Sequence, residues 1–390
     1  MIKQLRIHNY LSIREVTLDL RLRNVLVGPN MSGKSNIVDA LRFLTHIALS
    51  GLMNAINNRG GFSEILWKGI EEGQISFFLT LEVPSESDES PRVYIYELSL
   101  TGSTKAGTEG AFFIEKETLK RSDNKGEYIL ADFRDGQGKG FHRDGSVAFT
   151  TEMRSTKSFL EYSIPGWEGM DIKDIISSWR YYRLNPFAMR QPNMAADQLF
   201  LNEFGDNLCA WLLSLQTRYR DQYRRFEQAV KDLLPDISEV LTPPTQTGTT
   251  FLMIHEKPLR RPISLWRMSD GTLQFLALLS LIFAPTELGA PLFCVEEPEN
   301  HLHPRMLESL VELQQQRQRE LGSDAAQLII TTHSPHLVDL VTLDDLVVVE
   351  KEEGVTHCVR PSSKKHLRDL LEREELGLGD LWYSGALGEK

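Results

Sequence analysis

A glycine-rich segment near the amino end has the residue types and spacing to hold a phosphate group. Residues 28–35 read GPNMSGKS, follow the apolar run VLV and open a helix-like pattern, which matches GxxxxGK[ST] in its expected context. Two glycines let the backbone fold so that N–H groups point inward, and the positive end of the helix dipole adds to their attraction for phosphate. Lys34 can then reach the β and γ phosphates of ATP, and the Ser35 hydroxyl can ligate Mg²⁺.

The predicted ATP contacts around Lys34 and Ser35 also include Asn30, Ser32, Gly33 and Asn36. A glycine-rich turn before an ordinary helix is the competing interpretation. A match at four fixed positions arises by chance on the order of one time in a hundred in a chain of this length. The strand-like and helix-like flanks weaken the competing interpretation further.

An acidic turn in the last third follows the strand-like residues LFCV at 292–295. Carboxylates at the end of a central parallel strand face the ligand crevice. We predict that Glu296 holds Mg²⁺ through a bound water, and that Glu297 acts as a general base on the water attacking the γ-phosphate. A solvated acidic turn would be an equal alternative alone, but the phosphate-binding motif favours the catalytic interpretation.

Two further segments can face a phosphate group. His333 stands where the apolar strand at 328–331 ends, and its imidazole can hydrogen-bond the γ-phosphate or the attacking water. Ser269 and Gly271, in the sequence MSDGT, precede an apolar helix whose amino end can face phosphate. Taken alone, the first would be a turn residue and the second an ordinary helix cap. The other motifs and their spacing favour the functional interpretation.

The surrounding pattern predicts an α/β protein that places these residues at strand and helix ends. Strands are expected at 2–7, 16–20 and 24–27, a helix at 35–50, antiparallel β-hairpins over 73–149 and helical structure over 195–234. The last third alternates helix 271–283, strand 292–295, helix 304–320, strand 328–331, helix 335–341 and strand 346–350, as in a parallel sheet wound with helices. We divide the chain into 1–190, an amino-terminal lobe with the phosphate-binding motif and the hairpins, 191–260, a helical insertion, and 261–390, a carboxy-terminal lobe.

Composition limits the protein's surroundings and partners. The formal net charge of −11 argues against diffuse coating of nucleic acid, so any DNA contact is expected to be local. The three cysteines, Cys209, Cys294 and Cys358, lie far apart without zinc-site spacing, which fits a reducing cytosol. No apolar run approaches the roughly 20 residues of a spanning helix, and no signal peptide is visible. We expect a cytoplasmic protein with no membrane partner.

The order of these motifs resembles the ATPase heads of the ABC class, in particular the SMC, RecF and OLD-like branch. GPNMSGKS, MSDGT, LFCVEEPENHLHP, TTHSP, the start IHNYLSI and the closing LGDLWYSGALG carry the likeness. The implied fold is a P-loop NTPase with an ABC-type head, a β-rich lobe and a helical insertion. The resemblance implies that Ser269 and Gly271 of one subunit touch the γ-phosphate of ATP bound to the partner's Lys34, so that ATP closes a homodimer or a higher homo-oligomer. Glu296 replaces the usual Asp, and MSDGT departs from the transporter form LSGGQ.

The resemblance also extends to compact AAA-family or OLD-like ATPases encoded in bacterial anti-phage operons beside a separate nuclease or toxin. We therefore expect a slow ATPase that dimerises on ATP and controls a separate effector. The segment after His333 is too short for the nuclease domain of OLD proteins. A transporter subunit and a nuclease acting alone are weaker options.

The main alternative is a RecF-like DNA-repair ATPase. Its support is a basic helix with Arg218, Arg220, Arg224 and Arg225, on which Tyr219 and Tyr223 could stack bases. A solvated basic helix face is the favoured interpretation of this segment, given the acidic chain.

Overall fold

The computed structural model describes residues 1–84, 91–104, 112–124, 126–135, 137–151, 156–285, 290–363, 377–384 and 387. The chain divides into two compact units. Unit 1 comprises Met1–Trp179, Leu343–Glu375 and Ser384–Lys390, and unit 2 comprises Arg180–Thr342 and Leu376–Tyr383. Among the described residues, no helix combines the length and apolar character needed to cross a membrane. The three-part division predicted from the motifs remains a prediction.

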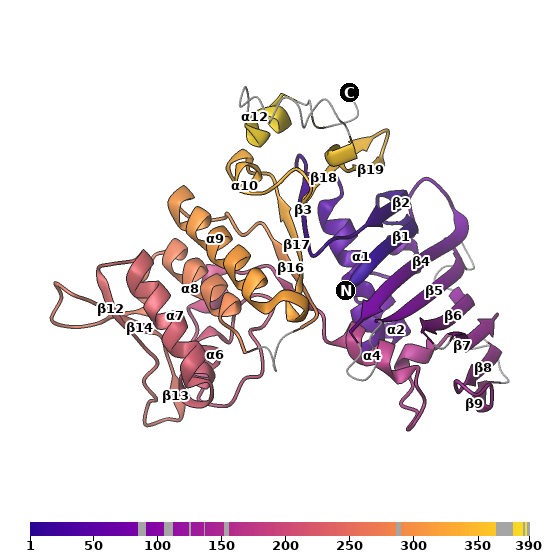
Figure 1. Cartoon of the computed structure of the whole chain (residues 1–390), viewed down its shortest axis with the longest axis horizontal. Helices are drawn as coiled ribbons and strands as arrows, with labels where there is room; N and C mark the ends of the chain where they lie inside the picture. Colours follow the sequence, from indigo (N-terminus) through magenta and orange to yellow (C-terminus); the bar gives the residue numbers. More distant parts are fainter. Residues whose placement is uncertain are drawn as a thin grey trace. The chain divides into compact units, whose positions relative to one another are not determined.

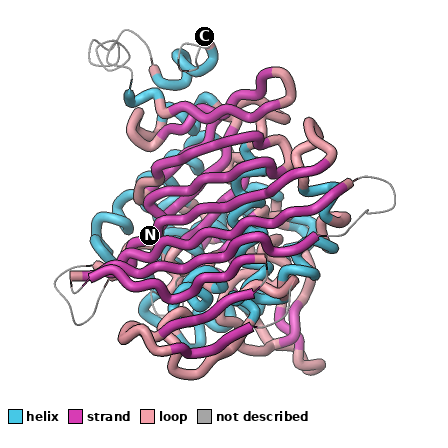
Figure 2. The backbone as a smooth tube through the Cα atoms, turned by 90° about the vertical axis from the view of Figure 1, so that its right-hand side faces the viewer, coloured by secondary structure: helices cyan, strands magenta, loops and turns pink. Residues whose placement is uncertain are grey.

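An antiparallel sheet of eight strands dominates unit 1, with the order β2-β1-β4-β5-β6-β7-β8-β9 (Figures 1 and 2). The predicted hairpins over 73–149 are therefore confirmed. Alternate residues of the long strands are buried, as in β4, where Ile75, Phe77, Leu79 and Leu81 enter the core. The strands are β1 (Ile2–Tyr10), β2 (Ile13–Asp19), β4 (Glu72–Val83), β5 (Arg92–Ser103), β6 (Phe112–Asp123), β7 (Gly126–Arg134), β8 (Gln137–Phe141) and β9 (Val147–Thr151).

Unit 1 also contains a second group of strands that joins both ends of its sequence. β3 (Arg23–Val27) pairs in parallel with β18 (Leu346–Glu352), which pairs antiparallel with β19 (Val355–Val359). The helix α1 (Lys34–Ser50) follows β3, close to the predicted 35–50, and buries its apolar face at Ile37, Leu41 and Leu44. The remaining elements of the unit are α2 (Leu52–Asn57), α3 (Phe62–Ile65), η1 (Phe159–Glu161), α4 (Met170–Ser177) and η5 (Pro361–Ser363).

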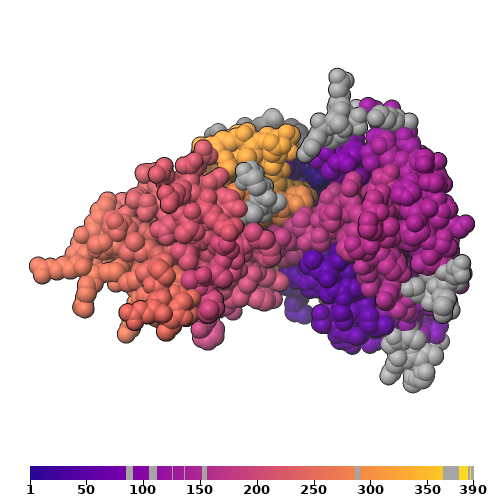
Figure 3. All heavy atoms as spheres, turned by 90° about the horizontal axis from the view of Figure 1, so that it is seen from below, coloured from indigo at the N-terminus to yellow at the C-terminus, as the bar shows by residue number. Residues whose placement is uncertain are grey.

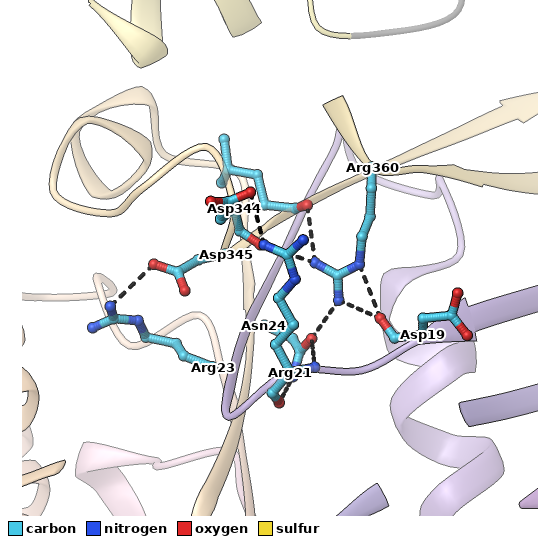
Figure 4. A network of polar contacts seen from close by, with 8 residues as sticks. Asp19, Arg21, Arg23, Asn24, Asp344, Asp345 and Arg360 are labelled. Atoms are coloured by element: carbon cyan, nitrogen blue, oxygen red, sulfur yellow. Dashed lines mark hydrogen bonds and ion pairs between the residues drawn. The ribbon is translucent and has the colours of Figure 1, made fainter. Parts of the chain in front are cut away.

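An arginine network ties these strands together at the amino ends of β3 and β18 (Figure 4). Arg360 donates through Nε and Nη2 to the carbonyl oxygen of Asp19, at 2.9 and 2.7 Å, and through Nη2 to Asn24 Oδ1 at 2.5 Å. Arg21 Nη1 lies 2.8 Å from Asp344 Oδ1, and Arg23 Nη2 lies 3.0 Å from Asp345 Oδ2. These contacts therefore link the ends of β2, β3, β18 and β19, which come from opposite ends of the sequence.

Unit 2 has its own parallel strands, β10 (Arg180–Tyr182), β16 (Leu292–Glu296) and β17 (Gln327–Thr332), with β16 pairing with both others. The helices α6 (Leu208–Arg218), α7 (Arg220–Leu233), α8 (Asp270–Ile282), α9 (Pro304–Leu321) and α10 (Pro335–Asp339) belong to this unit (Figure 1). The predicted alternation over 271–341 is confirmed to within a few residues. Two exposed stretches, residues 246–248 and 257–261, belong to the salmon to orange surface in Figure 3.

The remaining elements of unit 2 are short. They are α5 (Pro186–Met189), β11 (Asn193–Met194), β12 (Ile237–Leu241), β13 (Thr249–Thr250), β14 (Met253–Glu256), β15 (Ile263–Ser264), η2 (Leu265–Arg267), η4 (Gly322–Asp324) and α12 (Leu378–Tyr383).

The helix expected from residue 195 begins only at Leu208, so that prediction is wrong for residues 195–207. Gly205 has φ 74°, which ends any helix there. The Asn207 side chain accepts from the Asn202 N–H at 2.8 Å and donates to the Phe200 carbonyl at 3.0 Å. These bonds hold the segment as a turn, because an Asn side chain offers the backbone an alternative to helical hydrogen bonds.

A buried carboxyl group on β6 joins the large sheet to the elements beside it. Glu117 is 1% exposed and accepts hydrogen bonds from the Tyr96 hydroxyl at 2.8 Å, from the Ser158 hydroxyl and from the Phe159 N–H at 2.9 Å. Ser158 caps η1, whose Glu161 accepts from the Leu52 N–H at the start of α2. Burial raises the pKa of Glu117 to about 7, against the lowering effect of these hydrogen bonds.

Replacing Glu117 by Gln should flatten the pH dependence of stability. Because the folded pKa of about 7 exceeds the unfolded value of 4.5, the folded state binds more protons between them. The free energy of unfolding of the wild type therefore falls as pH rises through this window, by at most about 3 kcal/mol. Urea unfolding at several pH values measures the effect. The exposed Glu127→Gln is the control, and an unchanged slope in Glu117→Gln would contradict the assignment.

Candidate functional site

Close packing determines the conformation of the predicted phosphate loop, residues 28–33 between β3 and α1. Gly33 has φ 107°, and a Cβ added there would lie 2.1 Å from Thr356 Oγ1 on β19. A Cβ added at Gly28 would lie 2.1 Å from the carbonyl oxygen of Val349 on β18. Neither position has room for a side chain, and Gly33 also has a backbone conformation that favours glycine. The two glycines of the motif are therefore required by the neighbouring strands.

The amino end of α1 provides positive potential beside this loop. The helix has 17 residues, its cap Gly33 offers no side-chain hydrogen bond, and its first turn contains no acidic residue. A helix of this length has an effective positive charge of about half an electron at its amino end. Since no side chain of the first turn neutralises that charge, the helix end suits a phosphate group.

The side chains of Lys34 and Ser32 place hydrogen-bond donors at this loop. Lys34 is buried, and its Nζ donates to the carbonyl oxygens of Gly28 at 2.7 Å and Pro29 at 2.9 Å. The Ser32 hydroxyl is buried and has no hydrogen-bond partner in the part of the chain that the structure describes. A buried hydroxyl without a partner is costly. A phosphate oxygen could accept a hydrogen bond from the Ser32 hydroxyl, and another could accept from the Lys34 ammonium group. The two residues therefore fit a triphosphate.

Two residues that sequence reasoning missed support the loop from β19 and from the turn after β1. The Asn36 side chain donates to Ser12 Oγ at 2.6 Å, Ser12 Oγ lies 2.7 Å from Thr356 Oγ1, and Thr356 Oγ1 donates to the Ser32 carbonyl at 3.0 Å. Asn36 thus braces the loop, and its contact with ATP remains a prediction. Ser12 could have been suspected from its place in the turn, but nothing in the sequence points to Thr356, which lies 344 residues from Ser12.

The other predicted contacts in unit 1 are exposed to solvent: Asn30 lies in the loop, and Ser35 lies in the first turn of α1. Their contacts with ATP and Mg²⁺ also remain predictions.

Replacing Lys34 by Ala should weaken ATP binding by at least about 100-fold, because each lost bond to a charged group is worth roughly 1.5–3 kcal/mol. Titration of a fluorescent ATP analogue measures the dissociation constant. The exposed Lys139→Ala on β8 is the matched control and should bind as the wild type does. Equal affinity in Lys34→Ala would remove this loop as the nucleotide site, provided that the melting temperature shows the variant to be folded.

The acidic half of the predicted site lies in unit 2, where two parallel strands end together. Glu296 ends β16 and is in register with Thr331 of β17. The N–H of Glu297 donates to the Thr331 carbonyl at 2.9 Å, and Glu297 has φ 47°. A left-handed conformation costs a non-glycine residue of order 1 kcal/mol or more and persists where the surrounding structure enforces it. The strand ends therefore hold Glu297 in a fixed and strained geometry.

The structure brings two predicted catalytic residues together at this point. Glu297 Oε1 lies 3.8 Å from His333 Nδ1, and Glu297 Oε2 accepts from the Asn300 side chain at 2.9 Å. The Glu297 side chain is 37% exposed and that of His333 is 42% exposed. Both can therefore reach a water molecule or a ligand while their positions are restrained, which is what a general base and a polarising imidazole require.

Ser269 and Gly271 lie at the amino end of α8, as predicted. Ser269 is exposed and caps the helix, and its Oγ accepts from the Thr272 N–H at 3.0 Å. A Cβ added at Gly271 would lie 2.5 Å from the carbonyl oxygen of His301. This close approach requires glycine and ties the start of α8 to the turn that follows Glu297.

A further side chain that sequence reasoning missed fixes the start of α8. Arg190 Nη1 lies 2.6 Å from Asp270 Oδ1, and its Nη2 donates to the Met268 carbonyl at 2.7 Å. An arginine that binds a carboxylate and a carbonyl at once restricts the chain on both sides of Ser269. No pattern in the sequence links Arg190 to this motif.

The predicted Mg²⁺ ligands, Ser35 and Glu296, belong to different units and remain predictions. Within the described ranges, no group of three His, Cys, Asp or Glu side chains has the geometry of a metal site. Mg²⁺ in phosphate sites is commonly held by one or two protein oxygens together with water and phosphate. A hydroxyl that binds the ion directly and a carboxylate that binds it through water, as predicted, would be of that kind.

The predicted basic helix differs from expectation. A break at Tyr219, with φ −118° and ψ 58°, leaves Arg218 on α6 and the other arginines on α7. Tyr223 is 6% exposed and donates to the Val240 carbonyl at 2.7 Å. Tyr223 is therefore a core residue, and its expected role in base stacking is wrong. Arg218, Arg220, Arg224 and Arg225 are all exposed, and two of them form ion pairs, Arg218 with Asp197 and Arg224 with Asp221.

Comparison with known proteins gives two results. The family model described as "AAA domain, putative AbiEii toxin, Type IV TA system" matches residues 23–339. No curated protein sequence matches the chain.

Several solved structures are similar in fold. One is an Smc head bound to the C-winged helix domain of ScpA, with TM-score 0.57 and 14% identity over 92% of this chain and 97% of that one. An SMC head from Thermotoga maritima has TM-score 0.45 and 16% identity over 92% and 98% of the two chains. An Smc head bound to the C-terminal domain of ScpA from Pyrococcus furiosus has TM-score 0.49 and 13% identity over 96% and 99%.

Proposed function

Because the chain belongs to the AbiEii-type AAA-domain family and has the fold of the ABC-type, SMC-like ATPase heads, we propose that it binds and slowly hydrolyses ATP. The observation that carries this proposal is the phosphate loop. Here the buried ammonium group of Lys34, the buried Ser32 hydroxyl, which has no partner among the described residues, and the amino end of a 17-residue helix without a side-chain cap converge. A triphosphate would bring negative charge to the ammonium group and the helix end, and an acceptor to the hydroxyl.

In the proposed reaction, Lys34 and Ser32 donate to the β and γ phosphates, Ser35 would ligate Mg²⁺, and Glu296 would hold the ion through a bound water. The metal ion neutralises charge on the phosphate oxygens when bound. Glu297 orients and polarises the attacking water, and His333 donates to the γ-phosphate or that water. The longer side chain of Glu296, in place of the usual Asp, is expected to slow turnover.

We further propose that ATP closes two copies of the chain head to head. In this arrangement Ser269 and Gly271 of one copy cap the γ-phosphate bound at Lys34 of the other. The exposure of Ser269 and the fixed geometry of its flanks support this step, since Arg190 and the close approach to His301 already order the helix start. A preorganised cap loses little conformational entropy on binding.

The dimer would act as a switch or scaffold for a separate effector, a nuclease or toxin, in bacterial anti-phage defence. The family description, which refers to a toxin–antitoxin system, supports this setting. The similar Smc head in complex with a domain of ScpA is an example of a partner protein bound to a head of this fold.

Replacing Glu297 by Gln should preserve ATP binding but stop hydrolysis, and so accumulate the closed dimer. The amide keeps the size and the hydrogen bond to Asn300 but cannot act as a base. Light scattering with and without ATP and Mg²⁺ should show the mass doubling only with nucleotide. The exposed Glu312→Gln on α9 is the control. An unchanged mass with ATP bound would count against closure.

Replacing Ser269 by Arg should block dimerisation while a single head still binds ATP, because the larger side chain fills the space of the cap. Loss of the helix cap itself costs about 1 kcal/mol, and Ser269→Ala measures that share. The exposed Ser323→Arg controls for the added charge. Hydrolysis at the wild-type rate in Ser269→Arg would refute a site shared between two copies.

The RecF-like alternative depends on Arg218 of α6 and on Arg220, Arg224 and Arg225 of α7, and their exposure is its one structural support. DNA binding that weakens steeply with salt and is lost when these four are replaced would favour it. Salt-insensitive or absent binding would favour the effector switch.

A further inference from the structure

A third carboxylate, Glu299, follows Glu297 in the turn after β16 and has no part in the reaction proposed above. Its side chain is only 10% exposed. Glu299 Oε1 accepts from the Thr332 hydroxyl at 2.6 Å and from the His333 N–H at 3.3 Å. A single oxygen atom therefore contacts the main chain at His333 and the side chain just before it.

Hydrogen bonds of Thr332 also restrain the chain on the other side of His333. Thr332 is fully buried, and its Oγ1 also accepts from the Ser334 N–H at 3.0 Å. Ser334 in turn caps α10 through the Leu337 N–H at 3.4 Å. Glu299, Thr332 and Ser334 thus fix the chain on both sides of His333, whose own side chain remains 42% exposed.

The imidazole ring faces the same carboxylate. His333 Nδ1 lies 3.7 Å from Glu299 Oε1 and 3.8 Å from Glu297 Oε1. Carboxylates beside one ring nitrogen orient the ring and favour a proton on that nitrogen. The other nitrogen, Nε2, is then left for the nucleotide.

The second oxygen of Glu299 distinguishes this residue from a simple structural bridge. Oε2 is buried and has no hydrogen-bond partner among the described residues. An unsatisfied buried carboxylate oxygen costs stability. A residue that served only to join the two strand ends could do so at lower cost with a neutral side chain. The retained charge beside the imidazole points to a role in the reaction.

We propose that Glu299 is a positioning residue for His333, which it holds by the main chain and by the ring. This inference depends on the ATPase function proposed above. Glu299 itself is not expected to touch the nucleotide, so the loss of its charge should lower kcat and leave the KM for ATP unchanged.

The test measures steady-state ATP hydrolysis by the full chain. Glu299→Gln keeps an oxygen that can accept from Thr332 and the His333 N–H but lacks the charge. Its kcat should fall roughly 10- to 100-fold, the range found when the hydrogen-bond partner of a metal-binding histidine is replaced, with KM within about twofold. Glu308→Gln, an exposed residue on α9, is the matched control and should behave as the wild type.

A double-mutant comparison separates positioning from general structure. If Glu299 acts through His333, adding Glu299→Gln to His333→Ala should change kcat by less than about twofold. Thermal melting of each variant checks folding, and Thr332→Val tests the main-chain bridge without altering the charge.

The outcomes are distinguishable. If the wild type hydrolyses ATP and Glu299→Gln keeps its full kcat, or lowers kcat equally with and without His333, the positioning role is overturned while the proposed function stands. If the wild type neither binds nor hydrolyses ATP, the proposed function fails and this inference fails with it.

Discussion

The contact between the phosphate loop and the strands β18 and β19 is the constraint on which the candidate nucleotide site depends. Gly28 lies against the Val349 carbonyl, and Gly33 lies against the Thr356 hydroxyl, at distances that leave no room for a Cβ. The loop conformation is therefore imposed from outside the motif. Thr356 also donates to the loop at Ser32, so a polar contact accompanies the close packing.

This constraint explains why the two ends of the sequence fold into one unit. The arginine network around Arg360 and Asn24 fixes the amino ends of the strands whose carboxyl ends lead to the loop or pack against it (Figure 4). β3 and β18 are paired in parallel between these two points. A triphosphate held at the loop would thus be coupled to strands more than three hundred residues apart in sequence.

Unit 2 carries its functional groups under a different kind of restraint. Glu297 and His301 both have left-handed backbone conformations, and Glu299 has a buried oxygen without a partner among the described residues. These features are unfavourable individually, and they occur together in one turn. Strain and unsatisfied polar groups gather at functional sites because the surrounding structure can enforce geometry that the turn alone would not adopt. The same turn holds the start of α8 through Gly271.

The sequence by itself determined which groups are candidates for the site. Spacing and residue type pointed to Lys34 and Glu297, because a phosphate loop and a strand-end carboxylate are local features. The other motifs added His333 and Ser269, and the roles of all four remain predictions. Periodicity was enough for α1 and for the large sheet. It failed where side chains compete with the backbone, as at Asn207, and where an amphipathic pattern hid a core residue, as at Tyr223.

Only the tertiary structure decided which residues support those groups. Thr356 reaches the loop across the whole length of the chain, Arg190 reaches the cap of α8, and Glu299 reaches the chain around His333. Such contacts depend on which strands and turns become neighbours, and that is set by long-range packing. No local pattern of residues records it, so these supporting residues could be found only once the chain was folded.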